Sequence, residues 1–137
     1  MGNRTVAEIM TTQVEILKRS DSLRRARDIM EERRIRHFPV VENGKVVGVV
    51  SHRDILRASL SSTLSYREEK ENAFLDNLSL KGVVHEPAVT VGQDASIQEA
   101  ARLMVEHKIG CLPVVDGERL VGLVSETDIL RVVAGGY

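Results

Sequence analysis

The sequence has few aromatic residues, a single cysteine and no long apolar run. Aromatic residues make up 3% of its 137 residues, too few for the stacking surfaces on which proteins bind single-stranded nucleic acid. No apolar run approaches the roughly 20 residues of a membrane-spanning helix, and the first residues carry no apolar signal region. Cys111 stands in a predicted strand, where we expect a buried thiol in a reducing compartment. These absences favour a cytoplasmic protein that does not contact membranes.

The spacings that mark catalytic and metal sites are also missing. Four histidines fall at no metal-ligand spacing, namely His37, His52, His85 and His107. The chain has no P-loop and no Gly-x-Gly-x-x-Gly pattern, and the sequence around Cys111 offers no activating base. We therefore expect a protein that is not an enzyme and that uses no metal and no catalytic cofactor.

The composition is that of an ordinary globular domain, but the charge is unevenly distributed. Hydrophobic residues make up 42% and charged residues 28% of the chain, which is long enough to bury a core. Residues 1–60 carry a net charge of +4 and residues 61–137 a net charge of −5. Many of the basic residues lie between Lys18 and Arg36. Three interpretations of these basic residues are open: the solvated face of a helix, a phosphate-binding rim, or a face that helps two copies associate.

An internal repeat organises the chain. Shifting the sequence by 74 residues aligns residues 6–60 with residues 80–134 without a gap, and 16 of these 55 pairs are identical. The identities include a proline, a glycine and the serine and aspartate of a Ser-x-x-Asp pattern that ends in Asp54 and in Asp128. A gapless duplication of this kind predicts two copies of one supersecondary unit.

Each copy predicts the element order β-α-β-β-α. In the first we expect a helical lead-in at 5–10, a strand at 14–17, a helix capped within 20–22, a hairpin of strands 38–41 and 46–50, and a closing helix from 54 to about 60. In the second we expect a strand at 88–91, a helix capped by Asp94, hairpin strands 114–115 and 120–124, and a helix that starts at the second Ser-x-x-Asp and ends at Gly135-Gly136. A charged helix is predicted at 66–78, between the copies.

The copies resemble a known family through two pairs of motifs. They are Arg36-His-Phe-Pro-Val-Val41 with Gly48-Val-Val-Ser-x-x-Asp-Ile-Leu-Arg57, and Gly110-Cys-Leu-Pro-Val-Val115 with Gly122-Leu-Val-Ser-x-x-Asp-Ile-Leu-Arg131. Each copy resembles a CBS (cystathionine-β-synthase-type) domain, and the tandem resembles a Bateman module. The resemblance implies an α/β fold with two repeats packed about a pseudo-twofold axis. The expected domains are repeat 1 at 1–60, a connector at 61–79 and repeat 2 at 80–137.

The resemblance also implies a binding site for an adenosine-containing nucleotide. The ribose hydroxyls would bind to Asp54 and Asp128. Candidate phosphate donors are Arg36, His37, Ser51, Arg53, Lys108, Ser125 and Thr127, and candidate residues around the adenine are Val14, Phe38, Ala88, Leu112 and Val124. The second copy has Gly110-Cys111 where the first has the basic pair Arg36-His37, so we expect two unequal sites.

Each of these residues also has a structural interpretation. Ser-x-x-Asp is a helix N-terminal capping pattern, the apolar residues fit a core, and the basic residues fit a solvated surface.

The resemblance implies a homodimer that senses AMP, ADP, ATP, S-adenosylmethionine or a dinucleotide between its repeats and acts on a separate protein. The alternatives are a ligand-free dimeric scaffold and, less favoured by composition, a nucleic-acid-binding protein.

Overall fold

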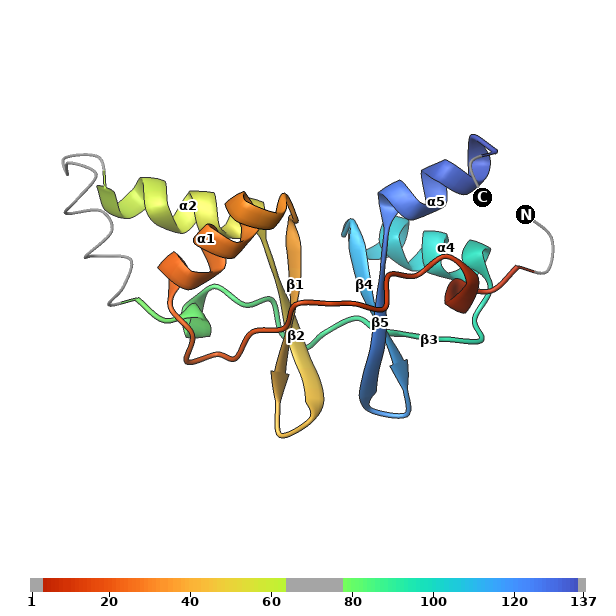
Figure 1. The fold of residues 1–137 in the computed structure, drawn as a ribbon, viewed down its shortest axis with the longest axis horizontal. Helices are drawn as coiled ribbons and strands as arrows, with labels where there is room; N and C mark the ends of the chain where they lie inside the picture. Colours follow the sequence, from red (N-terminus) through yellow and green to blue (C-terminus); the bar gives the residue numbers. More distant parts are fainter. Residues whose placement is uncertain (1–3, 64–77, 136–137) are drawn as a thin grey trace. The chain divides into compact units, whose positions relative to one another are not determined.

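The structure, a computed structural model, describes residues 4–63 and 78–135 and is an α/β fold with two sheets (Figure 1). A two-stranded sheet has the order β1-β2, and a three-stranded sheet has the order β3-β4-β5. The first copy contributes η1 (Val6–Glu8), α1 (Leu23–Arg33), β1 (His37–Glu42), β2 (Lys45–Ser51) and α2 (His52–Thr63). The second contributes η2 (Leu80–Gly82), β3 (Val91–Gly92), α4 (Ile97–His107), β4 (Cys111–Asp116), β5 (Arg119–Ser125) and α5 (Glu126–Val133). The predicted fold class is confirmed.

Serine side chains cap the first α-helix of each repeat. Ser22 accepts a hydrogen bond from the backbone N–H of Arg25 at 3.0 Å, so the predicted cap within residues 20–22 is confirmed. In the second repeat Ser96 accepts from the N–H of Glu99 at 3.0 Å. The prediction of Asp94 as the cap is wrong, because the helix begins two residues later and the repeat-equivalent serine occupies the capping position.

The hairpin turns depend on residues with positive φ. Asn43 and Gly44 have φ angles of 52° and 79°, and positive φ at both central residues is what a tight type I′ turn requires. Gly117 has a φ of 64° in the second turn. The pairing of β4 with β5 shifts register between Val114 and Val115. Both hairpins have two-residue turns at equivalent positions, and the glycine is the second turn residue in repeat 1 and the first in repeat 2.

The predicted outer strands are shorter than expected. Leu17 forms only an isolated parallel bridge with Val40, and no strand covers 14–17. In the second repeat β3 contains only Val91 and Gly92, which pair in parallel with β4. The residues of the segments 14–17 and 88–91 do not by themselves show how many of them will pair with a neighbouring strand. The predicted strands were therefore longer than the observed ones.

The segment between the repeats lies mostly outside the described residues. Helix α2 extends to Thr63, past its predicted end near residue 60. The predicted helix at 66–78 falls within 64–77, apart from its last residue, and is not described. The structure resumes with Leu78, whose carbonyl accepts a hydrogen bond from the N–H of Leu23 at 2.9 Å.

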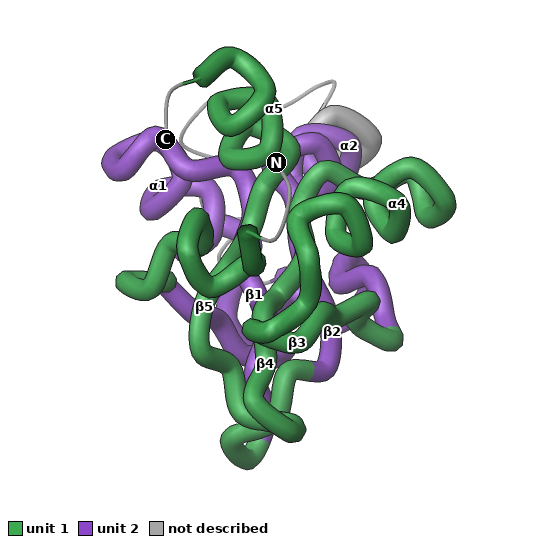
Figure 2. Tube along the Cα trace, turned by 90° about the vertical axis from the view of Figure 1, so that its right-hand side faces the viewer, with its two compact units in different colours: residues 1–14, 43–46, 87–137 green, residues 15–42, 47–86 purple. Residues whose placement is uncertain are grey.

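The chain divides into two compact units that do not coincide with the two repeats (Figure 2). Unit 1 contains Met1–Val14, Asn43–Val46 and Pro87–Tyr137, and unit 2 contains Glu15–Glu42 and Val47–Glu86. The segment that begins each repeat therefore belongs to the unit that holds most of the other repeat. The lead-in of repeat 1 lies in unit 1, and the lead-in of repeat 2 lies in unit 2.

Equivalent contacts hold both lead-in segments. In unit 1 Thr5 bridges Ser96, the cap of α4, and in unit 2 Ser79 bridges Ser22, the cap of α1. The side chain of Val6 is fully buried in the core of unit 1, as that of Leu80 is in the core of unit 2. Complete burial of an aliphatic side chain contributes about 1.5–3 kcal/mol. Each lead-in is therefore part of a core.

A glycine lets each lead-in segment cross a strand. A Cβ atom on Gly48 would lie 2.5 Å from the carbonyl oxygen of His85 in unit 2. In unit 1 a Cβ atom on Gly122 would lie 2.6 Å from the Met10 sulfur and 2.9 Å from the carbonyl oxygen of Thr11. None of these three distances is one that a real Cβ atom adopts. The glycine of each repeat is required because the other repeat's backbone passes over it.

Candidate functional site

The Ser-x-x-Asp residues lie where the second hairpin strand passes into the closing helix. In unit 1 Ser125 caps α5, because its hydroxyl accepts from the N–H of Asp128 at 3.2 Å. The Asp128 carboxylate in turn accepts from the Ser125 N–H at 2.8 Å and from its hydroxyl at 3.0 Å. Asp128 is buried. A reciprocal capping box therefore places a buried carboxylate at the positive end of the helix.

The first repeat has the same geometry in unit 2. Asp54 Oδ2 accepts from the Ser51 N–H at 2.9 Å and from its hydroxyl at 2.7 Å, while the Asp54 N–H donates to that hydroxyl at 3.2 Å. One contact extends the pattern, because His85 Nε2 lies 2.8 Å from Asp54 Oδ1. The Asp54 side chain is 10% exposed and that of His85 is 74% exposed. The imidazole therefore covers the carboxylate from the solvent side.

These contacts fix the ionisation of Asp54. Burial of the carboxyl group acts to raise its pKa, but hydrogen bonds from the Ser51 hydroxyl, the Ser51 N–H and His85, with the charge of His85, outweigh burial. The net effect holds the pKa of Asp54 below its usual value. Asp54 is therefore an anion at neutral pH. Because a carboxylate can only accept hydrogen bonds, the Nε2 atom of His85 must be the donor.

The residue before each first hairpin strand lies beside the same helix start. The N–H of His52 donates to the carbonyl of Arg36 at 2.7 Å, and in unit 1 the N–H of Glu126 donates to the carbonyl of Gly110 at 2.9 Å. Arg36 is exposed and His37 is half-buried. The backbone of Arg36 therefore lies beside the start of α2, and the phosphate role of Arg36 and His37 stays a prediction.

The remaining predicted phosphate donors are distributed over both units. Ser51 and Ser125 are half-buried and already bonded to the aspartates, whereas Arg53, Lys108 and Thr127 are exposed. Arg53 and Thr127 stand in the first turn of their helices, and Lys108 is the left-handed C-cap of α4. Their role towards a phosphate stays a prediction.

The predicted adenine residues separate into two groups. The side chains of Phe38, Leu112 and Val124 are fully buried in the cores, which supports the packing interpretation and leaves only their backbone atoms to face a ligand. Val14 and Ala88 are half-buried on coil segments of unit 1. The register pairs Leu112 with Val124 directly before the α5 start, so this pair supports the helix start from within the core.

Cys111 lies in the core beneath the second helix start, opposite Ser125 in the β4–β5 register. Burial, and next the negative charge of Asp128, raise the pKa of its thiol far above the usual value. A thiol of this kind is protonated and unreactive at neutral pH. The expected structural role of Cys111 is supported.

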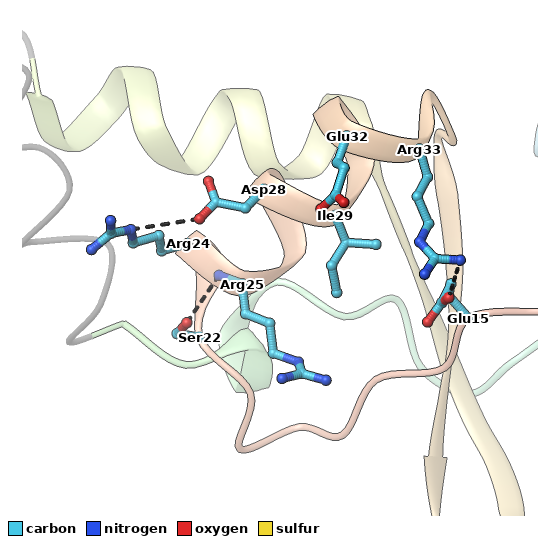
Figure 3. A pocket seen from close by; sticks show the side chains of 8 residues that line it. All are labelled: Glu15, Ser22, Arg24, Arg25, Asp28, Ile29, Glu32 and Arg33. Atoms are coloured by element: carbon cyan, nitrogen blue, oxygen red, sulfur yellow. Dashed lines mark hydrogen bonds and ion pairs between the residues drawn. The ribbon is translucent and has the colours of Figure 1, made fainter.

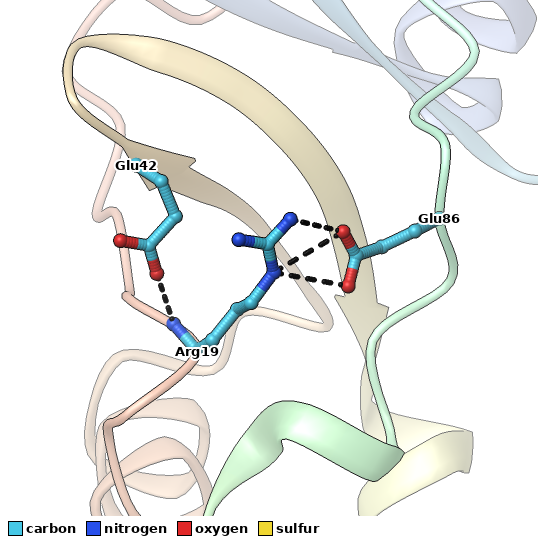
Figure 4. A network of polar contacts seen from close by, with 3 residues as sticks. All are labelled: Arg19, Glu42 and Glu86. Atoms are coloured by element: carbon cyan, nitrogen blue, oxygen red, sulfur yellow. Dashed lines mark hydrogen bonds and ion pairs between the residues drawn. The ribbon is translucent and has the colours of Figure 1, made fainter.

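A charged network fastens the end of the repeat 2 lead-in to unit 2 (Figure 4). Arg19 Nε donates to the Glu86 carboxylate at 3.1 Å, and the backbone N–H of Arg19 donates to Glu42 at 2.8 Å. The guanidinium holds the pKa of Glu86 below its usual value. Glu86 directly follows His85 in the chain, so two consecutive side chains of the crossing segment are held.

Helix α1 carries a shallow hollow lined by charges of both signs (Figure 3). Arg33 Nη1 lies 2.6 Å from Glu15 Oε1, and Arg24 Nε lies 3.6 Å from Asp28 Oδ2. None of the predicted ribose, phosphate or adenine residues lines this hollow. The pairing of these arginines with acidic side chains supports the interpretation of a solvated helix face.

Sequence reasoning missed the part that His85 has in the first site. The shift of 74 residues aligns it with Thr11, so the repeat gave no hint of a histidine beside the aspartate. The lead-in of repeat 2 packs in unit 2 and brings His85 beside Asp54, where the His85 backbone pairs with Val49 through two hydrogen bonds of 2.9 and 3.2 Å. In unit 1 Thr11 forms the equivalent pair with Leu123. Local patterns do not contain a signal for this pairing.

The family model of the CBS domain matches twice, over residues 6–61 and 80–135. The chain belongs to the CBS domain family. Three solved structures are similar to this chain over almost their whole length. A putative acetoin utilization protein from Vibrio cholerae is 34% identical, with a TM-score of 0.82 over 98% of this chain and 95% of that chain. The CBS domain pair of protein MJ0100, in complex with 5′-methylthioadenosine and S-adenosyl-L-methionine, is 26% identical, with a TM-score of 0.81 over 98% of both. CBSX2 in complex with AMP is 25% identical, with a TM-score of 0.77 over 96% of both.

Several curated relatives with this CBS pair are longer proteins. The chain spans 33%, 42% and 25% of the length of three relatives to which it is 33% identical. Within residues 4–63 and 78–135, no helix is both long and apolar enough to cross a membrane. The same residues contain no group of three or more His, Cys, Asp or Glu side chains placed to hold a metal ion.

Proposed function

We propose that this CBS pair is a regulatory module that binds an adenosine-containing nucleotide through Asp54 and Asp128 and alters the state of a partner protein. The observation that carries the proposal is the same carboxylate at two helix starts, each held by its serine through Oδ2. A fixed carboxylate at such a position suits a pair of ribose hydroxyls, which are hydrogen-bond donors. CBS pairs of the same fold that are 25% and 26% identical bind AMP and S-adenosyl-L-methionine.

We propose the phosphate roles on the same basis. Arg36, His37 and Arg53 would serve a phosphate near Asp54, and the hydrogen bond from the His52 N–H to the Arg36 carbonyl, which holds the Arg36 backbone beside the helix start, supports this. Near Asp128 the candidates are Ser125, Thr127 and Lys108, without a basic pair. The two sites therefore differ, and a phosphorylated ligand prefers the Asp54 site.

The competing candidate is a dimeric scaffold without ligand. The reciprocal capping hydrogen bonds favour it, because they explain Ser51, Asp54, Ser125 and Asp128 by helix stability alone. Both functions fit a homodimer, and the exposed apolar side chains of Leu130 and Val133 on α5 and Leu56 on α2 would serve as its contact. A monomer in sedimentation at tens of micromolar, with and without nucleotide, contradicts the dimer.

The proposal also places the protein in the cytoplasm and gives the module no catalytic step of its own. A buried, protonated Cys111 suits a reducing compartment. Regulation would act on another protein or on a further part of a longer chain, since three relatives are two to four times longer than the matched part.

Thermal unfolding with a panel of AMP, ATP, S-adenosylmethionine and 5′-methylthioadenosine tests the proposal. A ligand at about 100 times its dissociation constant stabilises the folded chain by about 2.7 kcal/mol. Calorimetry on Asp54→Ala and Asp128→Ala then separates the two functions. Loss of a charge-assisted hydrogen bond costs about 1.5–3 kcal/mol, so each variant loses about 10- to 150-fold in affinity at its own site. Unchanged affinity in both variants, with lower melting temperatures, favours the scaffold.

A further inference from the structure

The exposed ring of His85 has no part in the two-serine, two-aspartate pattern of the family motif, yet it contacts the aspartate on which the proposed function rests. Its Nε2 donates to Asp54 Oδ1 at 2.8 Å. The position of the ring is set by the backbone as well as by the side chain, because the His85 backbone is paired with Val49 by two hydrogen bonds and lies against Gly48. The crossing segment therefore delivers the ring to the carboxylate.

The number of hydrogen-bond acceptor positions on the Asp54 carboxylate shows how the His85 contact limits ligand binding. A carboxylate offers about four acceptor positions, two on each oxygen. In unit 2 the Ser51 N–H and hydroxyl occupy Oδ2, and His85 occupies one position of Oδ1. About one position is left, whereas a ribose diol donates two hydrogen bonds. Both hydroxyls bind to Asp54 only if one existing donor leaves.

The donor that can leave is His85. The serine donors belong to the capping box, so removing them also breaks the helix start. The His85 side chain is 74% exposed, and its departure returns the imidazole to water at small cost. Of the charged neighbours, Glu86 is engaged by Arg19.

We propose that His85 is a specificity-determining residue of the Asp54 site, which a ribose diol must displace from Asp54 Oδ1. The inference rests on the proposed function and adds a difference between the two sites. At the equivalent position of unit 1 stands Thr11, which has a shorter side chain and no ring nitrogen. His85 therefore penalises ligands with two ribose hydroxyls at the Asp54 site and leaves a single hydroxyl unaffected.

The test exchanges His85 for the residue of the other repeat. In an Asp128→Ala background, which leaves the Asp54 site, adenosine and 2′-deoxyadenosine are titrated by NMR with and without His85→Thr. We expect His85→Thr to strengthen adenosine binding about fivefold and to change 2′-deoxyadenosine binding less than twofold. His107→Thr, at the end of α4 in unit 1, is the matched control and should change neither.

A second measurement uses the unaltered chain. Saturation with adenosine should shift the Nε2 resonance of His85, assigned by its loss in His85→Thr, because that nitrogen exchanges the carboxylate for water. An unchanged Nε2 resonance, or equal effects of His85→Thr on both nucleosides, overturns the inference and leaves the Asp54 site intact. Adenosine is common to every proposed ligand, so the absence of any adenosine-induced shift in the unaltered chain contradicts the proposed function and this inference together.

Discussion

Substitution of the crossing glycines by alanine tests how the two units are assembled. In Gly48→Ala the new Cβ would lie 2.5 Å from the His85 carbonyl oxygen and 2.5 Å from a methyl carbon of Val84. The oxygen belongs to the backbone, so relief requires the whole crossing segment to move away from β2. That movement weakens the two hydrogen bonds between Val49 and His85.

The expected cost follows from these contacts. Overpacking of this kind costs about 1–3 kcal/mol, and two weakened backbone hydrogen bonds add about 1 kcal/mol each. Replacing glycine also restricts the unfolded chain, which returns about 0.4–1 kcal/mol. We expect Gly48→Ala to lower the free energy of unfolding by about 2–5 kcal/mol, and the melting temperature by about 8–20 °C. In Gly122→Ala the new Cβ would lie 2.6 Å from the sulfur of the flexible Met10 side chain and 2.9 Å from the Thr11 carbonyl oxygen, so we expect a smaller loss of the same sign.

Two other glycines provide the controls. No atom lies within 4 Å of a Cβ built on Gly82 or on Gly92, and neither has a positive φ. Gly82→Ala and Gly92→Ala should therefore change the free energy of unfolding by less than about 1 kcal/mol. Differential scanning calorimetry and urea unfolding measure all four variants. If Gly48→Ala and Gly122→Ala unfold like the controls, the lead-in segments do not cross the strands as described.

Three further predictions concern stability and reactivity. Because the pKa of Asp54 is lower in the folded chain, the carboxylate contributes to the free energy of unfolding above pH about 4, and this contribution is lost as the pH falls below that value. The free energy of unfolding in urea, measured between pH 7 and pH 3, should therefore depend less steeply on pH in Asp54→Ala than in the unaltered chain. Equal slopes would argue against the stabilised carboxylate. Leu80→Ala should cost about 2–5 kcal/mol because the side chain is fully buried, whereas the exposed neighbour Lys81→Ala should stay within about 0.5 kcal/mol. Cys111 should react with Ellman's reagent only after unfolding, because burial raises the pKa of its thiol; rapid labelling of the native chain would contradict its burial.

Local chemistry explains which features were predictable. The capping box around Asp128, the cap near Ser22 and the turn at Gly44 each involve residues within a few positions of one another, and each was predicted. The cap of α4 was predicted at Asp94, whereas the structure has it at Ser96, the residue that aligns with the cap Ser22 of the first repeat. The length of an outer strand depends on the partner strand, so the pairing of Leu17 by a single bridge was not predictable.

The sequence by itself determined the duplication, the order of the helices and hairpins and the position of both aspartates at helix starts, because periodicity, turn residues and capping act over short distances along the chain. Only the tertiary structure decided that each lead-in packs in the unit of the other repeat, that Gly48 and Gly122 are crossing points, and that His85 contacts Asp54. These features join segments that are tens of residues apart, and either unit could in principle have received either lead-in. Burial of Val6 and Leu80 in the two cores selects one arrangement, and a choice made by packing leaves no local pattern in the sequence.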